Sequence, residues 1–153
     1  MKLLLDTNIV TRLCHPARQG NQPVAAWVSA LLETQEHRVC VPEIADYEVR
    51  RGLTHVALKS GRSTSKSLQR LDLLSETLDY LPINTPTMKR AAALWADARH
   101  AGLPTAAGNA LDGDVIIAAQ ALEIGGLVVT ENLKHISRFV EAYRWQEAPV
   151  GLK

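Results

Sequence analysis

The sequence has few of the features that mark several large classes of protein. Its two cysteines, Cys14 and Cys40, form no CxxC pair and are too few for a disulfide framework. No apolar run approaches the roughly 18 residues that suggest a membrane span, and the start MKLLLDTN reaches an aspartate too soon for a signal peptide. The five histidines include no HExxH motif, which argues against zinc hydrolysis. We therefore expect a cytoplasmic protein with reduced thiols and no membrane partner.

Composition and length indicate an ordinary soluble domain. Hydrophobic residues make up 46% and charged residues 22% of the 153 residues. A chain of this length suits one domain that removes about 70% of its unfolded surface from water. We find no internal repeat and no linker, so we expect residues 1–153 to form a single domain.

Residues 111–132, LDGDVIIAAQALEIGGLVVTEN, predict a helix followed by a buried strand. Asp112 and Asp114 precede apolar residues at helical spacing, so we expect the helix to begin at an aspartate cap. The Gly-Gly pair then ends the helix, and the LVV that follows is typical of a strand covered on both faces. The polar residues after this strand would lie at the carboxyl edge of the sheet, where open α/β folds bind ligands.

The rest of the chain alternates in the same way and predicts a doubly wound α/β domain. Pro82 places the third predicted strand at an edge of the sheet or at a strand end, because proline cannot donate to a ladder. We assign a loop to 102–109 and no structure to 143–153. The expected strands are 2–6, 38–41, 80–83 and 127–129; the expected helices are 8–14, 23–36, one from Pro42 to a polar hinge at 61–65, 68–78, 85–98, one ending at the Gly-Gly pair, and a short one within 131–139.

The net charge of +1 gives no overall signal for nucleic acid, but basic residues are unevenly placed. The segment between Glu48 and Asp72 contains six lysines and arginines, including Arg50 and Arg51, and it contains no acid. This segment would suit phosphate binding, and it would equally suit a solvated helix face.

Three acids occupy places that a parallel sheet could bring together. Asp6 ends the first strand, Glu48 lies among apolar residues of the third helix, and Asp114 precedes the last strand. Carboxylates of this kind bind Mg²⁺ or Mn²⁺, which can orient a water and neutralise a phosphodiester. Taken singly, each acid is explained better by a helix cap or a surface ion pair than by a metal site.

The chain contains three motifs: LLLDTNIV, the glutamate in IADYEVRRGL, and DGDVIIAAQALEIGGLVVTEN. Together, and in this order along the chain, they resemble the PIN domain and specifically its VapC-like toxin ribonucleases. The resemblance implies a three-layer α/β/α sandwich with a short, mostly parallel sheet and a helical arm around 43–79. It also implies a metal-dependent endoribonuclease in which Asp6, Glu48 and Asp114 hold Mg²⁺ or Mn²⁺ and direct water at an RNA phosphate. A small antitoxin and a homodimer are the partners it implies.

Other positions match the family less uniformly. Thr7, Asn8 and Thr130 match polar positions that support the acids. Asp112 is an additional carboxylate, and the resemblance leaves open whether Asp112 or the supporting residue Asn132 completes the metal site. The family often has a fourth acid after the last strand, whereas this chain has Asn132 in that region.

The motifs also discriminate against other α/β folds. A haloacid-dehalogenase-like phosphatase needs a second aspartate two residues after the first, and position 8 is asparagine. A dinucleotide-binding domain needs GxGxxG after its first strand, which is absent. The remaining alternative is a non-catalytic PIN fold that binds RNA or protein. The RNA target, whether tRNA, rRNA or mRNA, is not encoded in these motifs.

Overall fold

The computed structural model describes residues 1–102 and 108–152, with the backbone alone at 108–110. The strands in this part of the chain are β1 (Lys2–Leu5), β2 (Arg38–Pro42), β3 (Asp79–Leu81), β4 (Leu127–Val129) and β5 (Ala142–Tyr143). The helices there are α1 (Thr7–Cys14), α2 (Gln22–Thr34), α3 (Glu43–Lys59), α4 (Lys66–Thr77), α5 (Thr85–His100), α6 (Gly108–Ile124), α7 (Leu133–Ile136) and a 3-10 turn at Trp145–Glu147.

The strands form one sheet in the order β3-β2-β1-β4-β5, and every pairing is parallel. β1 is central and its three leucines are fully buried, as expected for a strand covered on both faces. Leu3 and Leu5 face one hydrophobic cluster and Leu4 faces the other, because successive side chains alternate across a strand. The short parallel sheet predicted from the sequence is confirmed.

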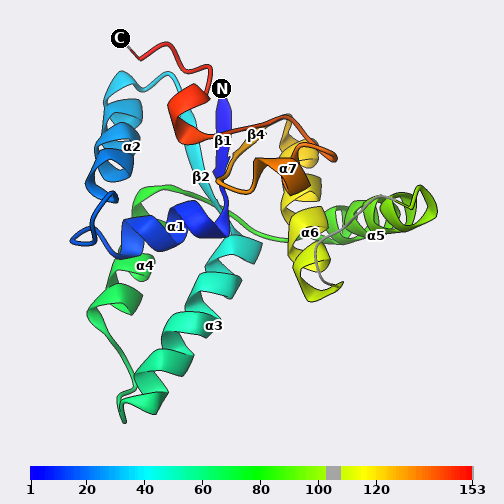
Figure 1. Cartoon of the computed structure of the whole chain (residues 1–153). Helices are drawn as coiled ribbons and strands as arrows, with labels where there is room; N and C mark the ends of the chain where they lie inside the picture. Colours follow the sequence, from blue (N-terminus) through cyan, green and yellow to red (C-terminus); the bar gives the residue numbers. More distant parts are fainter. Residues whose placement is uncertain (103–107, 153) are drawn as a thin grey trace.

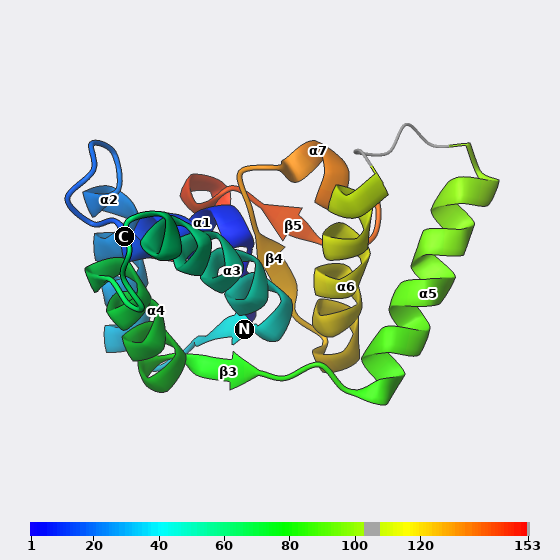
Figure 2. The same cartoon turned by 90° about the horizontal axis from the view of Figure 1, so that it is seen from below.

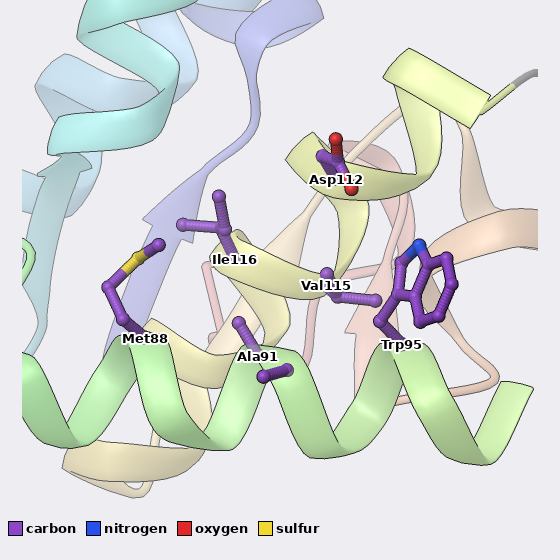
Figure 3. Close-up of a pocket in the computed structure, with 7 residues that line it drawn as sticks. Met88, Ala91, Trp95, Asp112, Val115 and Ile116 are labelled. Atoms are coloured by element: carbon purple, nitrogen blue, oxygen red, sulfur yellow. The ribbon is translucent and has the colours of Figure 1, made fainter.

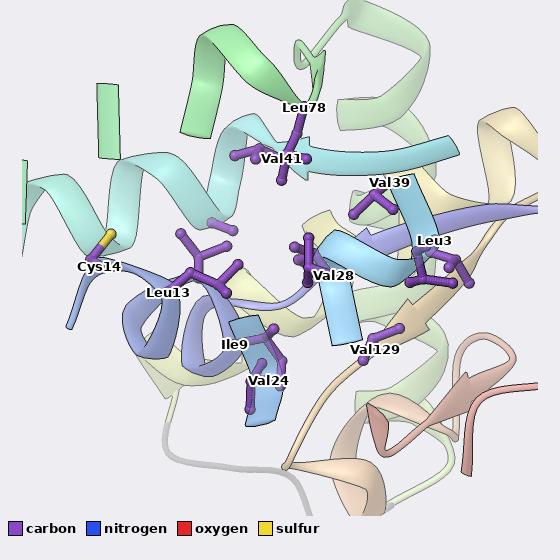
Figure 4. Packing of buried hydrophobic residues seen from close by; sticks show 14 of the residues in the cluster. Leu3, Ile9, Leu13, Cys14, Val24, Val28, Val39, Val41, Leu78 and Val129 are labelled. Carbon is purple, nitrogen blue, oxygen red and sulfur yellow. The ribbon is translucent and has the colours of Figure 1, made fainter. Parts of the chain in front are cut away.

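Helices cover both faces of the sheet and complete a three-layer α/β/α arrangement. On one face, Ile9 of α1 and Val24 and Val28 of α2 pack against Leu3 and Val129, as Figure 4 shows. On the other face, α6 packs against the sheet, and α5 lies outside α6 (Figures 1 and 2). The helices α3 and α4 lie side by side and extend away from the sheet (Figure 1).

The start of α6 differs from the prediction. The helix begins at Gly108, so Asp112 and Asp114 stand inside it and neither caps it. The apolar stripe begins earlier than expected, because Leu111, Val115 and Ala119 are all buried together at intervals of four residues. Burial of Leu111 continues the helix beyond the aspartates, and this packing prevails over their preference for a cap.

The other boundaries follow the sequence closely, with small differences. Gly125 adopts φ of 63° and ends α6, and the N–H of Gly126 bonds back to the carbonyl of Ala121. The edge position of β3 is confirmed. Asn84, one residue before the expected cap, caps α5 through its side chain. Within the expected loop, 103–107 lie outside the described residues, while 108 and 109 belong to α6.

The sequence did not predict β5. This strand has only two residues, and its pairing with β4 supplies the bonds from Val128 to the carbonyl of Glu141 and from Thr130 to that of Tyr143. A strand this short has no measurable alternation, so only its neighbour defines it.

Cys14 and Cys40 are buried and free, in agreement with the expectation of reduced thiols. Among the described residues, no helix is both long and apolar enough to cross a membrane.

Candidate functional site

Asp6 lies where β1 ends and α1 begins, and three donors hold its carboxylate. The backbone N–H of Thr7 donates to Oδ1 at 2.7 Å, while the Thr130 hydroxyl at 2.6 Å and the Asn8 amide at 3.3 Å donate to Oδ2. Asp6 is therefore also the N-cap of α1. Burial raises the pKa of Asp6, and the hydrogen bonds from Thr130, Thr7 and Asn8 act in the opposite direction.

Glu48 reaches the same region from α3. The Thr7 hydroxyl donates to its Oε1 at 3.2 Å, and Arg51 lies 3.8 Å from its Oε2. Its side chain is only 25% exposed. Burial raises the pKa of Glu48, the Thr7 hydroxyl and Arg51 lower it, and the charge of Asp6 raises it further. Thr7 thus contacts both acids, with its N–H on one and its hydroxyl on the other.

Asp114 approaches from α6. Its pKa is raised to about 6, first by burial and then by the negative charges of Asp6 and Glu48, while Arg138 lowers it. A Cβ on the neighbouring Gly113 would lie 2.8 Å from Oε1 of Glu48, and Asp6 and Glu48 both act on Asp114 through their charge, so the three carboxylates lie in one region beyond the carboxyl end of β1.

The three carboxylates do not close around a preformed ion site. In the part of the chain that the structure describes, no group of three or more His, Cys, Asp or Glu side chains is placed to hold a metal. The chemistry of the donors nevertheless fits a hard divalent cation, because all are oxygen ligands and their mutual repulsion would be relieved by positive charge. Within the described residues, Oδ1 of Asp6 accepts one hydrogen bond and retains a lone pair for a further ligand.

Asp112 lies away from this region. It is exposed and lines a groove of about 370 Å³ between α5 and α6, with Met88, Trp95 and Val115 (Figure 3). Residues two positions apart on an α-helix project about 200° apart around its axis, so Asp112 and Asp114 cannot face the same site. The structure therefore brings Asp114, and not Asp112, to Asp6 and Glu48.

The two arginines singled out in the sequence have different surroundings. Arg50 donates to both oxygens of Asp46, at 3.0 and 3.1 Å, and to Asp72 of α4 at 2.8 Å. The bond to Asp72 joins α3 to α4, and the three bonds together occupy the guanidinium of Arg50. Arg51 is 58% exposed, stacks over the Tyr47 ring at 5.1 Å and lies beside Glu48.

The residues directly after β4 form hydrogen bonds with Asp6 and Asn8 and with one another. The Thr130 hydroxyl accepts the N–H of Asn132 at 2.8 Å, and the Asn8 side chain accepts the N–H of Glu131 at 3.2 Å. Glu131 pairs with Arg12 of α1 at 2.8 Å. Asn132 is exposed, and it is its backbone that bonds to Thr130.

Two residues near the acids, Gly113 and Arg138, were not predicted from the sequence. A Cβ built on Gly113 would lie 2.8 Å from Oε1 of Glu48. A glycine inside a helix indicates close packing. Because the helix was expected to begin at an aspartate cap, Gly113 was not recognised as a residue of the helix interior. Nothing in the sequence singles out Arg138.

The sequence profile of the PIN domain matches residues 3–140. Among solved structures, the fold is similar to that of VapBC2 from Rickettsia felis bound to a DNA fragment from its promoter, with a TM-score of 0.72, 19% identity, and coverage of 95% of this chain and 99% of that chain. VapBC-1 from nontypeable Haemophilus influenzae has a TM-score of 0.66 and 21% identity, and the match covers 96% of this chain and 100% of that chain. FitAcB from Neisseria gonorrhoeae has a TM-score of 0.64 and 22% identity, with coverage of 95% of this chain and 99% of that chain. No curated protein matches. The profile covers most of the chain, which therefore belongs to the PIN domain family.

Proposed function

We propose that the protein is a metal-dependent endoribonuclease of the VapC-like toxin class. The observation that supports this most is the shared location of Asp6, Glu48 and Asp114, each with a raised pKa, beyond the carboxyl end of the central strand. Desolvated acids that repel one another are costly to the fold, and such clusters are typical of functional sites.

The acids would hold Mg²⁺ or Mn²⁺, and the metal, when bound, would orient a water and neutralise charge on an RNA phosphodiester. The chain contributes orientation. Thr7 and Thr130 each donate to a carboxylate oxygen of Asp6 or Glu48, which limits the rotation of both acids. Preorganised ligands of this kind need little rearrangement when substrate arrives.

We assign the approach of RNA to the side of Glu48 where Arg51 lies. An acidic site repels RNA unless nearby cations offset it, and Arg51 is exposed next to Glu48. Arg50 belongs to the α3–α4 contact in this proposal, because its donors are engaged by Asp46 and Asp72.

The proposed partners are a small antitoxin protein and a second copy of the chain, with the cytoplasm as the setting. The support for the antitoxin is the similarity in fold to chains of VapBC and FitAcB structures over nearly the whole length. For the homodimer, Met88 and Trp95 are exposed beside the α5–α6 groove and offer apolar surface that a second copy would cover. Light scattering of the purified chain, with and without a neighbouring gene product, tests both.

The second candidate is a PIN fold that binds RNA or protein without cutting. It is favoured by the absence, within the described residues, of a preformed group of three metal-binding side chains, and by Asn132 where a fourth acid often stands. Incubation of the chain with RNA, with Mn²⁺ or with a chelator, separates the two. The nuclease predicts Mn²⁺-dependent fragments that Asp6→Asn abolishes; equal traces of cleavage by wild type and Asp6→Asn would favour the binding module.

A further inference from the structure

Gly113 lies in the interior of α6, where glycine is less favourable than alanine. Its φ is not positive, so conformational freedom does not explain its presence. What distinguishes it is the close approach of Glu48. A Cβ at this position would lie 2.8 Å from Oε1, 3.3 Å from Cδ and 3.3 Å from Oε2 of that side chain. The Glu48 carboxylate thus occupies the space of a missing side chain.

We propose that Gly113 is a positioning residue for Glu48, a role that rests on the proposed nuclease function. The carboxylate is held between two elements: the Thr7 hydroxyl of α1 donates to Oε1, and the backbone of α6 at Gly113 lies against the same oxygen. Asp114 is the next residue of α6. The lack of a side chain at 113 therefore lets Glu48 and Asp114 approach the same region.

A methyl group at 113 would displace the carboxylate and leave the helix in place. On one side of α6, Leu111 and Val115 are buried in the cluster with Ala91 of α5, and on another Ile117 and Ala118 pack against the sheet. The atoms in conflict are the far end of the Glu48 side chain, which can turn aside by giving up its bond to Thr7. Gly113→Ala should therefore fold and should misplace Glu48.

The chain offers a matched control in Gly52, which is exposed in α3, the helix that carries Glu48. A Cβ at Gly52 would meet no atom within 4 Å. Gly52→Ala and Gly113→Ala both replace a helical glycine, so both should keep or raise the melting temperature of the metal-free protein. Only Gly113→Ala should affect the site.

The experiment combines crystal structures, titration calorimetry with Mn²⁺ and RNA cleavage for wild type, Gly113→Ala and Gly52→Ala. In Gly113→Ala we expect the 3.2 Å bond between Thr7 Oγ1 and Glu48 Oε1 to be lost, and Mn²⁺ affinity and kcat each to fall by about tenfold or more. Gly52→Ala should stay within about twofold of wild type. Glu48→Asp shortens the side chain, so adding Gly113→Ala to it should cost much less than adding it to wild type.

Two results would overturn the inference. One is a Gly113→Ala protein that keeps the Thr7–Glu48 bond and wild-type Mn²⁺ affinity. The other is a large loss of melting temperature, which would make Gly113 a packing requirement of α6. Failure of the nuclease proposal is distinguishable, because it would show as wild type and Asp6→Asn cutting equally little. The Glu48 position in the Gly113→Ala crystal structure would then decide the inference alone.

Discussion

Thr7 donates its hydroxyl to Oε1 of Glu48 at 3.2 Å, across 41 positions of sequence, while its backbone N–H donates to Oδ1 of Asp6. One residue of α1 therefore sets the orientation of a carboxylate on α3. This bond couples α1 to α3 at the point where the acids meet.

Thr7→Val removes that hydroxyl and keeps the backbone N–H and the shape of the side chain. We expect RNA cleavage to fall by about tenfold, because Glu48 loses its donor, and the free energy of unfolding to fall by about 1 kcal/mol. The control is Thr11→Val, which loses the hydroxyl bond to the Thr7 carbonyl at 2.8 Å without touching an acid. Equal activity losses in the two variants, measured at saturating RNA, would remove Thr7 from the site.

The raised pKa of Asp114 predicts a definite pH dependence of stability. A carboxyl whose pKa is about 6 in the folded chain, against an ordinary value of 3.8, binds more protons when folded than when unfolded, so it destabilises the metal-free fold progressively as pH rises between those values. Asp114→Asn should therefore stabilise the metal-free protein at pH 7.5 by about 1 kcal/mol, after discounting for its partial exposure, and by nearly nothing at pH 4. Urea unfolding at both pH values measures this. A variant that is less stable at pH 7.5 would contradict it.

Arg50 and Arg51, adjacent in sequence, should give opposite results on substitution. Arg50→Ala removes the partner of the buried Asp46 and should lower the free energy of unfolding by about 2 kcal/mol. Arg51→Ala should leave stability nearly unchanged and weaken RNA binding, with the slope of log K against log salt reduced by about 0.7. Fluorescence anisotropy with labelled RNA at several salt concentrations provides the slope. An unchanged slope for Arg51→Ala would return this arginine to a role on the solvated surface.

The sequence was most informative where local pattern and tertiary packing agree. The LLL run of β1, the LVV run of β4 and Pro82 beside the edge strand β3 each indicated burial or pairing directly. Asp6 could be placed at the carboxyl end of the central strand for the same reason, because it directly follows a buried apolar run.

Prediction failed where packing from a distant element decided the outcome. The start of α6 depends on Leu111 meeting α5, and β5 exists through its pairing with β4. The difference between Arg50 and Arg51 depends on Asp72 of α4, which lies 22 positions away. Gly113 was given no role from the sequence, since only the arrangement of α3 against α6 shows that Glu48 fills its space.

Asp112 provides a matched control, on the same helix, for the proposal that Asp114 belongs to a metal-dependent nuclease site. The most direct measurement is Mn²⁺-dependent RNA cleavage by Asp114→Asn and Asp112→Asn, with the Mn²⁺-induced rise in melting temperature recorded for both. Asp114 is preferable to Asp6 here, because an amide at position 6 would face the donors of Thr130 and Asn8. We expect Asp114→Asn to lose cleavage and most of the Mn²⁺-induced rise, while Asp112→Asn keeps both. Cleavage retained by Asp114→Asn, or lost equally in the two variants, would contradict the proposed site.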